Sequence, residues 1–103
     1  MIAEIVFLDL PPGTDRAAAL ALYRQSAVKW IANPDLIEKF YFFEAASCVG
    51  GGVYFWHSRE AANRWHGEEY RRTVLALYGS EPRIRILDAL MHVDPVAGTC
   101  TEL

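Results

Sequence analysis

The side chains of this 103-residue chain that are best suited to chemistry lie in a few short segments. Trp65 and His66 end a predicted helical segment just before Gly67. An indole at this point can stack on an aromatic ligand, and an imidazole can take up a proton near neutral pH. The alternative is that Trp65 belongs to the core and His66 is a solvated histidine favoured by the helix dipole. Residue type and spacing leave both interpretations open.

Lys39 and Tyr41 lie two residues apart, on one face of a predicted strand. A lysine between apolar residues is unusual in a strand that is covered on both sides. Its ammonium can extend to the rim of the fold, pair with a carboxylate such as Glu4 or Asp88, or hold a ligand oxyanion. We therefore keep three roles open for Lys39: solvated cation, ion-pair partner and anion-binding group.

Two later strands carry further polar side chains. Tyr54 and Trp56 share one strand face, where they either fill the core or line a cavity, and a buried tyrosine hydroxyl needs a hydrogen-bond partner. Arg83 and Arg85 share a face of the last strand, where they are solvated, form salt bridges at a subunit edge or bind an anion. No two histidines have metal-ligand spacing on one strand or helix, so we expect no metal site.

The composition bounds the class of protein. A net charge of −3, an apolar fraction of 52% and thirteen aromatic residues predict one globular domain with a bulky core. A weakly acidic chain with no basic run is not expected to bind nucleic acid or an anionic membrane. We see no transmembrane run and no signal peptide, so we expect a cytoplasmic protein with Cys48 and Cys100 as reduced structural thiols.

Apolar runs and chain breakers predict the elements. The first half of the chain is predicted to form a strand from Ile2 to Leu10, a helix capped by Thr14 that runs to about Trp30, and a strand from about Leu36 to Ala45. A third strand follows from Gly50–Gly52 to near His57. Ser58 then caps a helix that Gly67 interrupts and that resumes over Tyr70–Leu77, and a last strand covers Arg83–Val93. The glycine triplet indicates a bulge or a close backbone approach. We expect one domain over residues 1–94 and a loose tail over 95–103.

The resulting order, β-α-β-β-α-β with the second helix in two pieces, is the ferredoxin-like α+β pattern of a four-stranded antiparallel sheet with helices on one face. The strands are nevertheless apolar on both sides, with Val53 and Phe55 opposite Tyr54 and Trp56. The helices cover only one face, so a second copy of the sheet is expected to cover the other. The sequence therefore predicts a homodimer, a dimeric α+β barrel formed through the open sheet face.

Several segments resemble the YdhR-type monooxygenases. They are DLIEKFY over Asp35–Tyr41, GGVYFW over Gly51–Trp56, SREAA over Ser58–Ala62 followed by Trp65 and His66, and YGSEP over Tyr78–Pro82 with Ile84 and Asp88. The likeness runs from the first strand to about Asp94. That family belongs to the dimeric α+β barrel superfamily, together with the antibiotic-biosynthesis monooxygenases, whose members differ widely in function.

The resemblance implies an oxygenase that needs no flavin, haem or metal. In such chemistry a phenolate or enolate reduces oxygen directly, and the protein supplies a dry pocket, a proton acceptor and donors for the developing anion. We expect a small phenol or quinol in a pocket between helices and sheet. The expected catalytic residues are His66, Tyr54 and Lys39, and the expected substrate-binding residues are Trp65, Tyr41, Trp56 and Arg85. The alternatives are a ligand-binding protein without chemistry and a structural dimer without a cavity.

Overall fold

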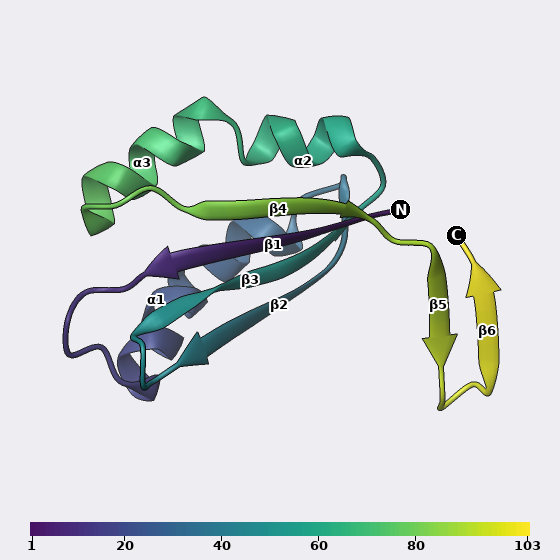
Figure 1. Ribbon diagram of the computed structural model, residues 1–103, viewed down its shortest axis with the longest axis horizontal. Helices are drawn as coiled ribbons and strands as arrows, with labels where there is room; N and C mark the ends of the chain where they lie inside the picture. Colours follow the sequence, from purple (N-terminus) through teal and green to yellow (C-terminus); the bar gives the residue numbers. More distant parts are fainter.

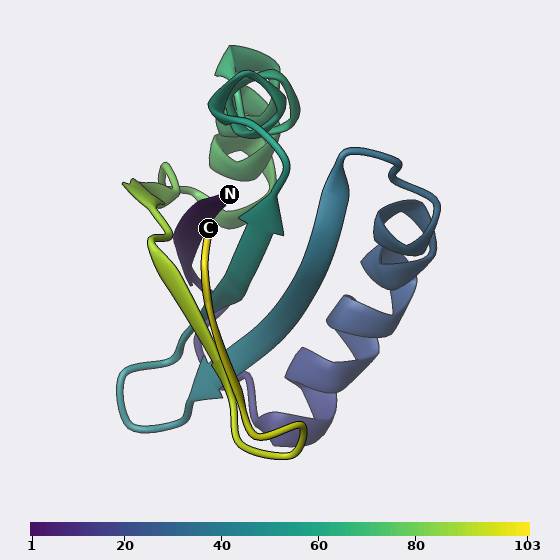
Figure 2. The same ribbon diagram turned by 90° about the vertical axis from the view of Figure 1, so that its right-hand side faces the viewer.

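The computed structural model describes residues 1–103, and its main body is one antiparallel sheet with three helices (Figures 1 and 2). The elements are β1 (Ile2–Asp9), α1 (Arg16–Ile31), β2 (Leu36–Glu44), β3 (Val49–Trp56), α2 (Arg59–Trp65), α3 (Glu68–Tyr78), β4 (Arg83–Asp88), β5 (Met91–Asp94) and β6 (Thr99–Glu102). The four-stranded sheet has the order β2-β3-β1-β4. This confirms the predicted ferredoxin-like fold with its second helix in two pieces. No helix is long and apolar enough to cross a membrane.

Side chains satisfy free backbone groups where α1 and α2 begin, whereas α3 begins after Gly67 without a side-chain cap. Asp15, and not Thr14, caps α1, because its carboxylate accepts a hydrogen bond from the Ala18 N–H (2.8 Å). The Thr14 hydroxyl donates instead to the Pro11 carbonyl (2.6 Å). Ser58 caps α2 as predicted, with its hydroxyl oxygen accepting a backbone N–H of the first turn (3.1 Å). The starts of α1 and α2 are therefore set by local polar contacts.

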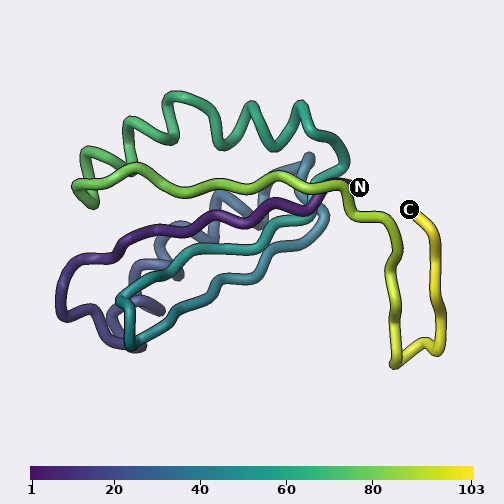
Figure 3. Tube along the Cα trace, viewed as in Figure 1, coloured from purple at the N-terminus to yellow at the C-terminus, as the bar shows by residue number.

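The chain after β4 differs from the prediction. A continuous strand to Val93 and a loose tail after it are both wrong, because β5 and β6 pair as a separate hairpin. β4 ends at Asp88 because this residue pairs with Ile2, the first residue of its partner β1. Beyond that point the chain turns away, and the hairpin stands apart from the sheet (Figures 1 and 3). No proline or glycine marks this break in the sequence.

Strand register places the side chains in rows across the sheet. One row faces the helices and runs through Lys39, Tyr54, Glu4 and Ile86, in the order of the strands. The next row faces away and runs through Phe40, Val53, Ile5 and Arg85. Arg85 therefore lies on the opposite face of the sheet from the other predicted site residues.

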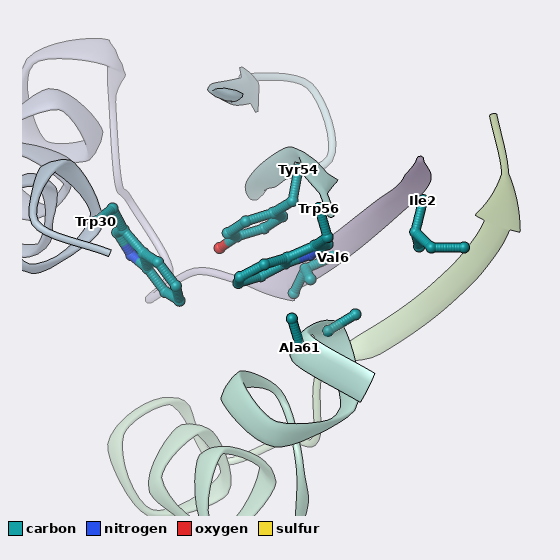
Figure 4. Packing of buried hydrophobic residues seen from close by; sticks show 7 residues of the cluster. Ile2, Val6, Trp30, Tyr54, Trp56 and Ala61 are labelled. Carbon is teal, nitrogen blue, oxygen red and sulfur yellow. The ribbon is translucent and has the colours of Figure 1, made fainter. Parts of the chain in front are cut away.

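Aromatic rings form the centre of the core between helices and sheet. The rings of Tyr54 and Trp56 stack at 5.8 Å with an interplanar angle of 5°, and Trp30 of α1 meets both edge-on (Figure 4). Val6 and Ala62, both fully buried, pack in the same cluster. Each large aromatic side chain removes ~150–250 Å² from water on burial, so these rings dominate the stability of the contact between layers.

Gly51 is the close backbone approach that the glycine triplet predicts. Its φ is +145°, and a Cβ atom at this position would lie 1.8 Å from the carbonyl oxygen of Val6 on the neighbouring strand. Its N–H donates to the Tyr23 hydroxyl of α1 (3.0 Å). Only glycine allows this backbone conformation and contact together.

Replacement of Gly51 by alanine should therefore strongly destabilise the fold. We expect Gly51→Ala to lower the free energy of unfolding by about 3 kcal/mol or more, since it adds a backbone clash to an unfavourable φ. Gly13→Ala is the matched control, because Gly13 has a φ of +84° with nothing near its Cβ position; we expect a loss of about 1–2 kcal/mol there. Equal losses in urea unfolding would contradict the steric explanation.

Candidate active site

A cavity of about 100 Å³ lies between α1, α3 and the sheet. All five tyrosines of the chain line it, namely Tyr23, Tyr41, Tyr54, Tyr70 and Tyr78, together with Lys39, Ser26, Trp30 and several aliphatic side chains. One water needs about 10–15 Å³ of such space, so the cavity has room for several waters or for about one aromatic ring. Its wall is thus aromatic, with hydroxyl groups and a single amine.

The Lys39 amine lies against three aromatic rings. Its Nζ is 3.7 Å from the ring centroid of Tyr41, 4.4 Å from that of Tyr54 and 4.5 Å from that of Trp30. These distances are in the range of cation–π attraction. Burial, and to a smaller extent the neighbouring Lys29 ammonium, lowers the pKa of Lys39 to about 7. Near neutral pH the cavity therefore contains both the charged and the neutral amine.

Neither carboxylate that we considered as a partner for Lys39 pairs with it. Asp88 forms its ion pair with Arg59 (3.3 Å), and Glu4 binds two other side chains. Of the three roles kept open for Lys39, the structure therefore does not realise the ion pair with Glu4 or Asp88. The lysine has no anionic partner within the chain, so the aromatic faces and any bound ligand are its neighbours.

Gly52 makes room for the stem of Lys39. It lies opposite Tyr41 across the β2–β3 pair. A Cβ atom at this glycine would be 3.0 Å from both the Lys39 Cε and the Tyr54 Cε1. A larger residue would displace the lysine from its place beside the rings. The glycine triplet thus shapes the floor of the cavity as well as the backbone of β3.

Two tyrosine hydroxyls are held by hydrogen bonds inside the chain. Tyr23 donates to the Phe42 carbonyl (2.8 Å) and accepts from the Gly51 N–H. Tyr41 shares a short hydrogen bond with the Ser26 hydroxyl. Burial raises the pKa of both phenols. These residues form a fixed, neutral part of the wall.

Tyr54 and Tyr70 have hydroxyls without a hydrogen-bond partner in the chain. Burial raises the pKa of each well above the usual value for tyrosine, and the neighbouring ionisable groups raise it further. Both therefore stay protonated at physiological pH and can donate to a ligand oxygen. The two hydroxyls and the Lys39 amine can all donate hydrogen bonds to a ligand in the cavity, and no carboxylate lines its wall.

His66 is buried in a pair with Glu4, directly beside the cavity. Glu4 Oε1 accepts hydrogen bonds from Trp56 Nε1 (2.9 Å) and from His66 Nδ1 (2.6 Å). The histidine ring packs against Tyr54 and Tyr70, each at 4.5 Å between centroids. His66 Nε2 and Glu4 Oε2 are both buried without a partner. The interpretation of His66 as a solvated residue is wrong, and its free nitrogen is enclosed by the protein.

The remaining predicted site residues lie outside the cavity wall. Trp56 is fully buried in the core. Trp65 is 42% exposed, so it is not a core residue, and its Nε1 donates to Asp35 Oδ2 (3.1 Å). Arg85 points to the open face of the sheet. Of the seven predicted residues, the structure brings Lys39, Tyr41 and Tyr54 together in one cavity.

The sequence reasoning missed Glu4 as a partner of His66, and Tyr70 and Trp30 as wall residues. Glu4 interrupts an otherwise apolar strand at an inward position, which signals a buried carboxylate with partners of its own. Tyr70 begins the predicted helical segment Tyr70–Leu77, and a tyrosine hydroxyl that is buried needs a polar or wet neighbour, which is the signal that could have indicated a wall residue. The residues next to Trp30 in the sequence do not indicate whether its side chain lines a cavity or belongs to the core.

A second hollow, of about 310 Å³, shares Trp30, Lys39 and Tyr41 with the cavity. It lies between the end of α1 and β2. Asn33 also lines it, and the Nδ2 of that residue is buried without a partner. Lys39 thus borders both spaces. No group of three His, Cys, Asp or Glu side chains comes together in the fold as a metal site.

Comparison with known proteins supports the fold. No family model matches the chain, and no curated protein matches it. Among solved structures, the chain is similar to one described as the crystal structure of an antibiotic biosynthesis monooxygenase. The TM-score is 0.64 with 18% sequence identity, over 87% of this chain and 99% of the other. The chain therefore has the fold of that monooxygenase, and at this identity the likeness is one of fold alone.

The Glu4 carboxylate should be essential for stability. Glu4→Leu leaves the Trp56 and His66 donors buried without an acceptor, so we expect the free energy of unfolding to fall by about 3–5 kcal/mol. Glu4→Gln keeps an acceptor oxygen without its charge, and we expect roughly half that loss. Chemical unfolding followed by tryptophan fluorescence measures both. A Glu4→Leu variant as stable as the parent would refute the role.

Proposed function

We propose that this protein is a cofactor-independent monooxygenase of the YdhR type, which oxidises a small phenol or quinol in the tyrosine-lined cavity. The observation that carries the proposal is the Lys39 amine, which has no anionic partner and lies in a one-ring space beside the unpartnered hydroxyls of Tyr54 and Tyr70. The likeness of the fold to an antibiotic biosynthesis monooxygenase supports the reaction class.

Lys39 is the base in this proposal, in place of the enclosed His66. The neutral amine takes the proton of the substrate hydroxyl, and the ammonium that results lies beside the new phenolate. In a space with little water this attraction is much stronger than in solution. The electron-rich anion then reacts with oxygen. One oxygen atom enters the ring as a quinone oxygen and the other leaves as water, so the substrate supplies all the electrons.

The neighbouring tyrosines assist by donating hydrogen bonds. Tyr54 and Tyr70 remain protonated, so their hydroxyls can bind the negative oxygen that develops as dioxygen is reduced. Trp30 and Tyr41 supply faces on which a ring can stack. The stacking role that the family resemblance implies for Trp65 stays a prediction, since this residue lies outside the cavity wall.

Oxygen uptake with a panel of phenols and quinols tests the activity and the base. With a substrate, we expect Lys39→Met to lower kcat/KM by about 100-fold or more, since general-base catalysis contributes at least that much. Lys39→Arg should lose as much, because arginine keeps the charge but is not a base at neutral pH. Arg24→Met, an exposed cation of α1, is the control. Binding without oxygen uptake would indicate a ligand-binding protein instead.

The same assay gives a pH dependence with a defined sign. A base must be unprotonated, so kcat/KM should fall about tenfold per pH unit below the pKa of Lys39, which lies at about 7, and level off above it. A rate that does not change between pH 5.5 and 8 would contradict the role of Lys39 as base.

We further propose that the protein is a homodimer through the open face of its sheet. This face carries Ile5, Phe40, Phe42, Val53, Phe55 and Leu87, and Phe40 is 57% exposed. Such a contiguous apolar surface is characteristic of an interface. The β5–β6 hairpin also exposes apolar side chains, among them Met91 and Val93. A two-stranded hairpin is at best marginally stable alone, so a partner subunit is expected to support it.

A charge on this face should dissociate the dimer. We expect sedimentation of the parent protein at twice the 11.6 kDa chain mass, and of Phe40→Glu at the mass of one chain. Burying an unpaired carboxylate in an apolar interface is strongly unfavourable. Val28→Glu, at an exposed apolar position on α1, is the matched control and should stay dimeric. A monomeric parent protein would refute the proposed assembly.

A further inference from the structure

The Lys39 amine combines three properties that are seldom found together in a lysine. It has no ion-pair or hydrogen-bond partner, it lines a cavity, and three aromatic rings lie around it at 3.7–4.5 Å. Acid–base chemistry needs only the first of these properties. An amine that can be neutral and is placed beside a space for one aromatic ring is also a nucleophile.

We propose that Lys39 is a carbonyl-reactive residue, and that this cavity captures a small aromatic aldehyde as an imine on its Nζ. This activity goes beyond oxygenation and does not depend on it. The ring of the aldehyde occupies the space between Trp30, Tyr41 and Tyr54, and its carbonyl carbon lies at the amine. The size of the cavity limits the ligand to about one ring.

The reaction needs no further reagent. The lone pair of Nζ attacks the carbonyl carbon, a C–N bond forms as the C=O π bond breaks, and one proton passes from the nitrogen to the oxygen to give a carbinolamine. This intermediate then loses its hydroxyl as water, and the nitrogen loses a proton as the C=N bond forms. Amine and aldehyde thus give imine and water. Tyr54 and Tyr70, which stay protonated, are placed to donate hydrogen bonds to the departing oxygen.

The groups around Lys39 keep its amine available. Lys29 of α1 opposes protonation by its charge, and the phenols of Tyr41, Tyr54 and Tyr70 are neutral. Glu38 precedes Lys39 on β2 and also lines the adjoining hollow of about 310 Å³, but it forms no ion pair with the lysine, and alternation along the strand directs its side chain to the other face. No carboxylate therefore holds the ammonium form in place. Burial supports the neutral form, with a pKa of about 7.

The chain offers an internal comparison, because it has two lysines and one N-terminal amine. Lys29 lies on the exposed side of α1, with its Nζ over the Trp30 ring at 4.9 Å. It lies outside the wall of the tyrosine-lined cavity. Met1 is 40% exposed at the start of β1. Preferential reaction at Lys39 would thus report its surroundings and not the general reactivity of amines.

Reductive trapping tests the proposal. The full-length protein is incubated with benzaldehyde and cyanoborohydride at pH 7, and the benzylated amines are located by peptide mass spectrometry. We expect the adduct at Lys39 to form at least about tenfold faster than the adduct at Lys29, while the exposed N-terminal amine, with an ordinary pKa of about 7.7–8.0, is also labelled and is scored as a separate peptide. Lys39→Arg should abolish the Lys39 adduct, and Lys29→Arg should leave it intact. Hexanal, which lacks a ring, should trap more slowly than benzaldehyde.

Equal labelling of the two lysines in the parent protein would overturn the proposal. Site mapping in the parent protein decides the question even if the Lys39 variant fails to fold. The result is independent of the oxygenase proposal. Trapping without oxygen uptake would refute only the oxygenase, and oxygen uptake without trapping would refute only the imine.

Discussion

The buried carboxylate of Glu4 is the contact on which the cavity depends. It lies near the start of β1, one of the two inner strands of the sheet, and one oxygen accepts from both Trp56 on β3 and His66 at the end of α2. A buried carboxylate is stable only with such partners. The bond to His66 fixes the point where α2 ends and α3 begins. Since α3 carries Tyr70 and Tyr78, Glu4 determines where the roof of the cavity lies.

The electrostatics of the cavity follow from what surrounds it. Two acidic side chains near the site are engaged elsewhere: Glu4 with Trp56 and His66, and Asp35 with the indole of Trp65 and with Arg64. Glu38, which lines the adjoining hollow, forms no ion pair with Lys39. The wall itself offers neutral phenols and one amine. An unpaired amine in such a place is held partly neutral by burial, while an anion formed next to it is stabilised. The Lys39 side chain can therefore act as a base when its amine is neutral and bind an anion when its amine is protonated.

Much of the fold could be predicted from the sequence, because the apolar runs and caps are local signals. The broken helix was predicted from its cap Ser58 and from Gly67, and the close contact between strands was predicted from the glycine triplet. The break at Asp88 could not be predicted, since it depends on where β1 begins and not on any residue near the break. The alternation of β2 correctly placed Lys39 and Tyr41 on one face, whereas the position of Tyr54 opposite Lys39 depends on the register between β2 and β3.

The site was harder to predict, because it depends on which side chains meet across layers. Trp65 and His66 are adjacent in sequence but point to different surroundings, one at the surface and one in the core. His66 and Glu4 are 62 positions apart and meet only through the packing of α2 on β1. The spacing of these two residues in the sequence does not indicate that their side chains meet. The lone Glu4 in an apolar strand was the available signal.

The central claim is that Lys39 is an amine that is neutral near physiological pH. Carbon NMR of protein labelled at the lysine Cε positions tests it directly, because the chain has two lysines and Lys39→Arg removes one of the two signals. The account predicts that the signal lost in this variant titrates with a midpoint near 7. A midpoint near 10.5, the usual value for lysine, would contradict it.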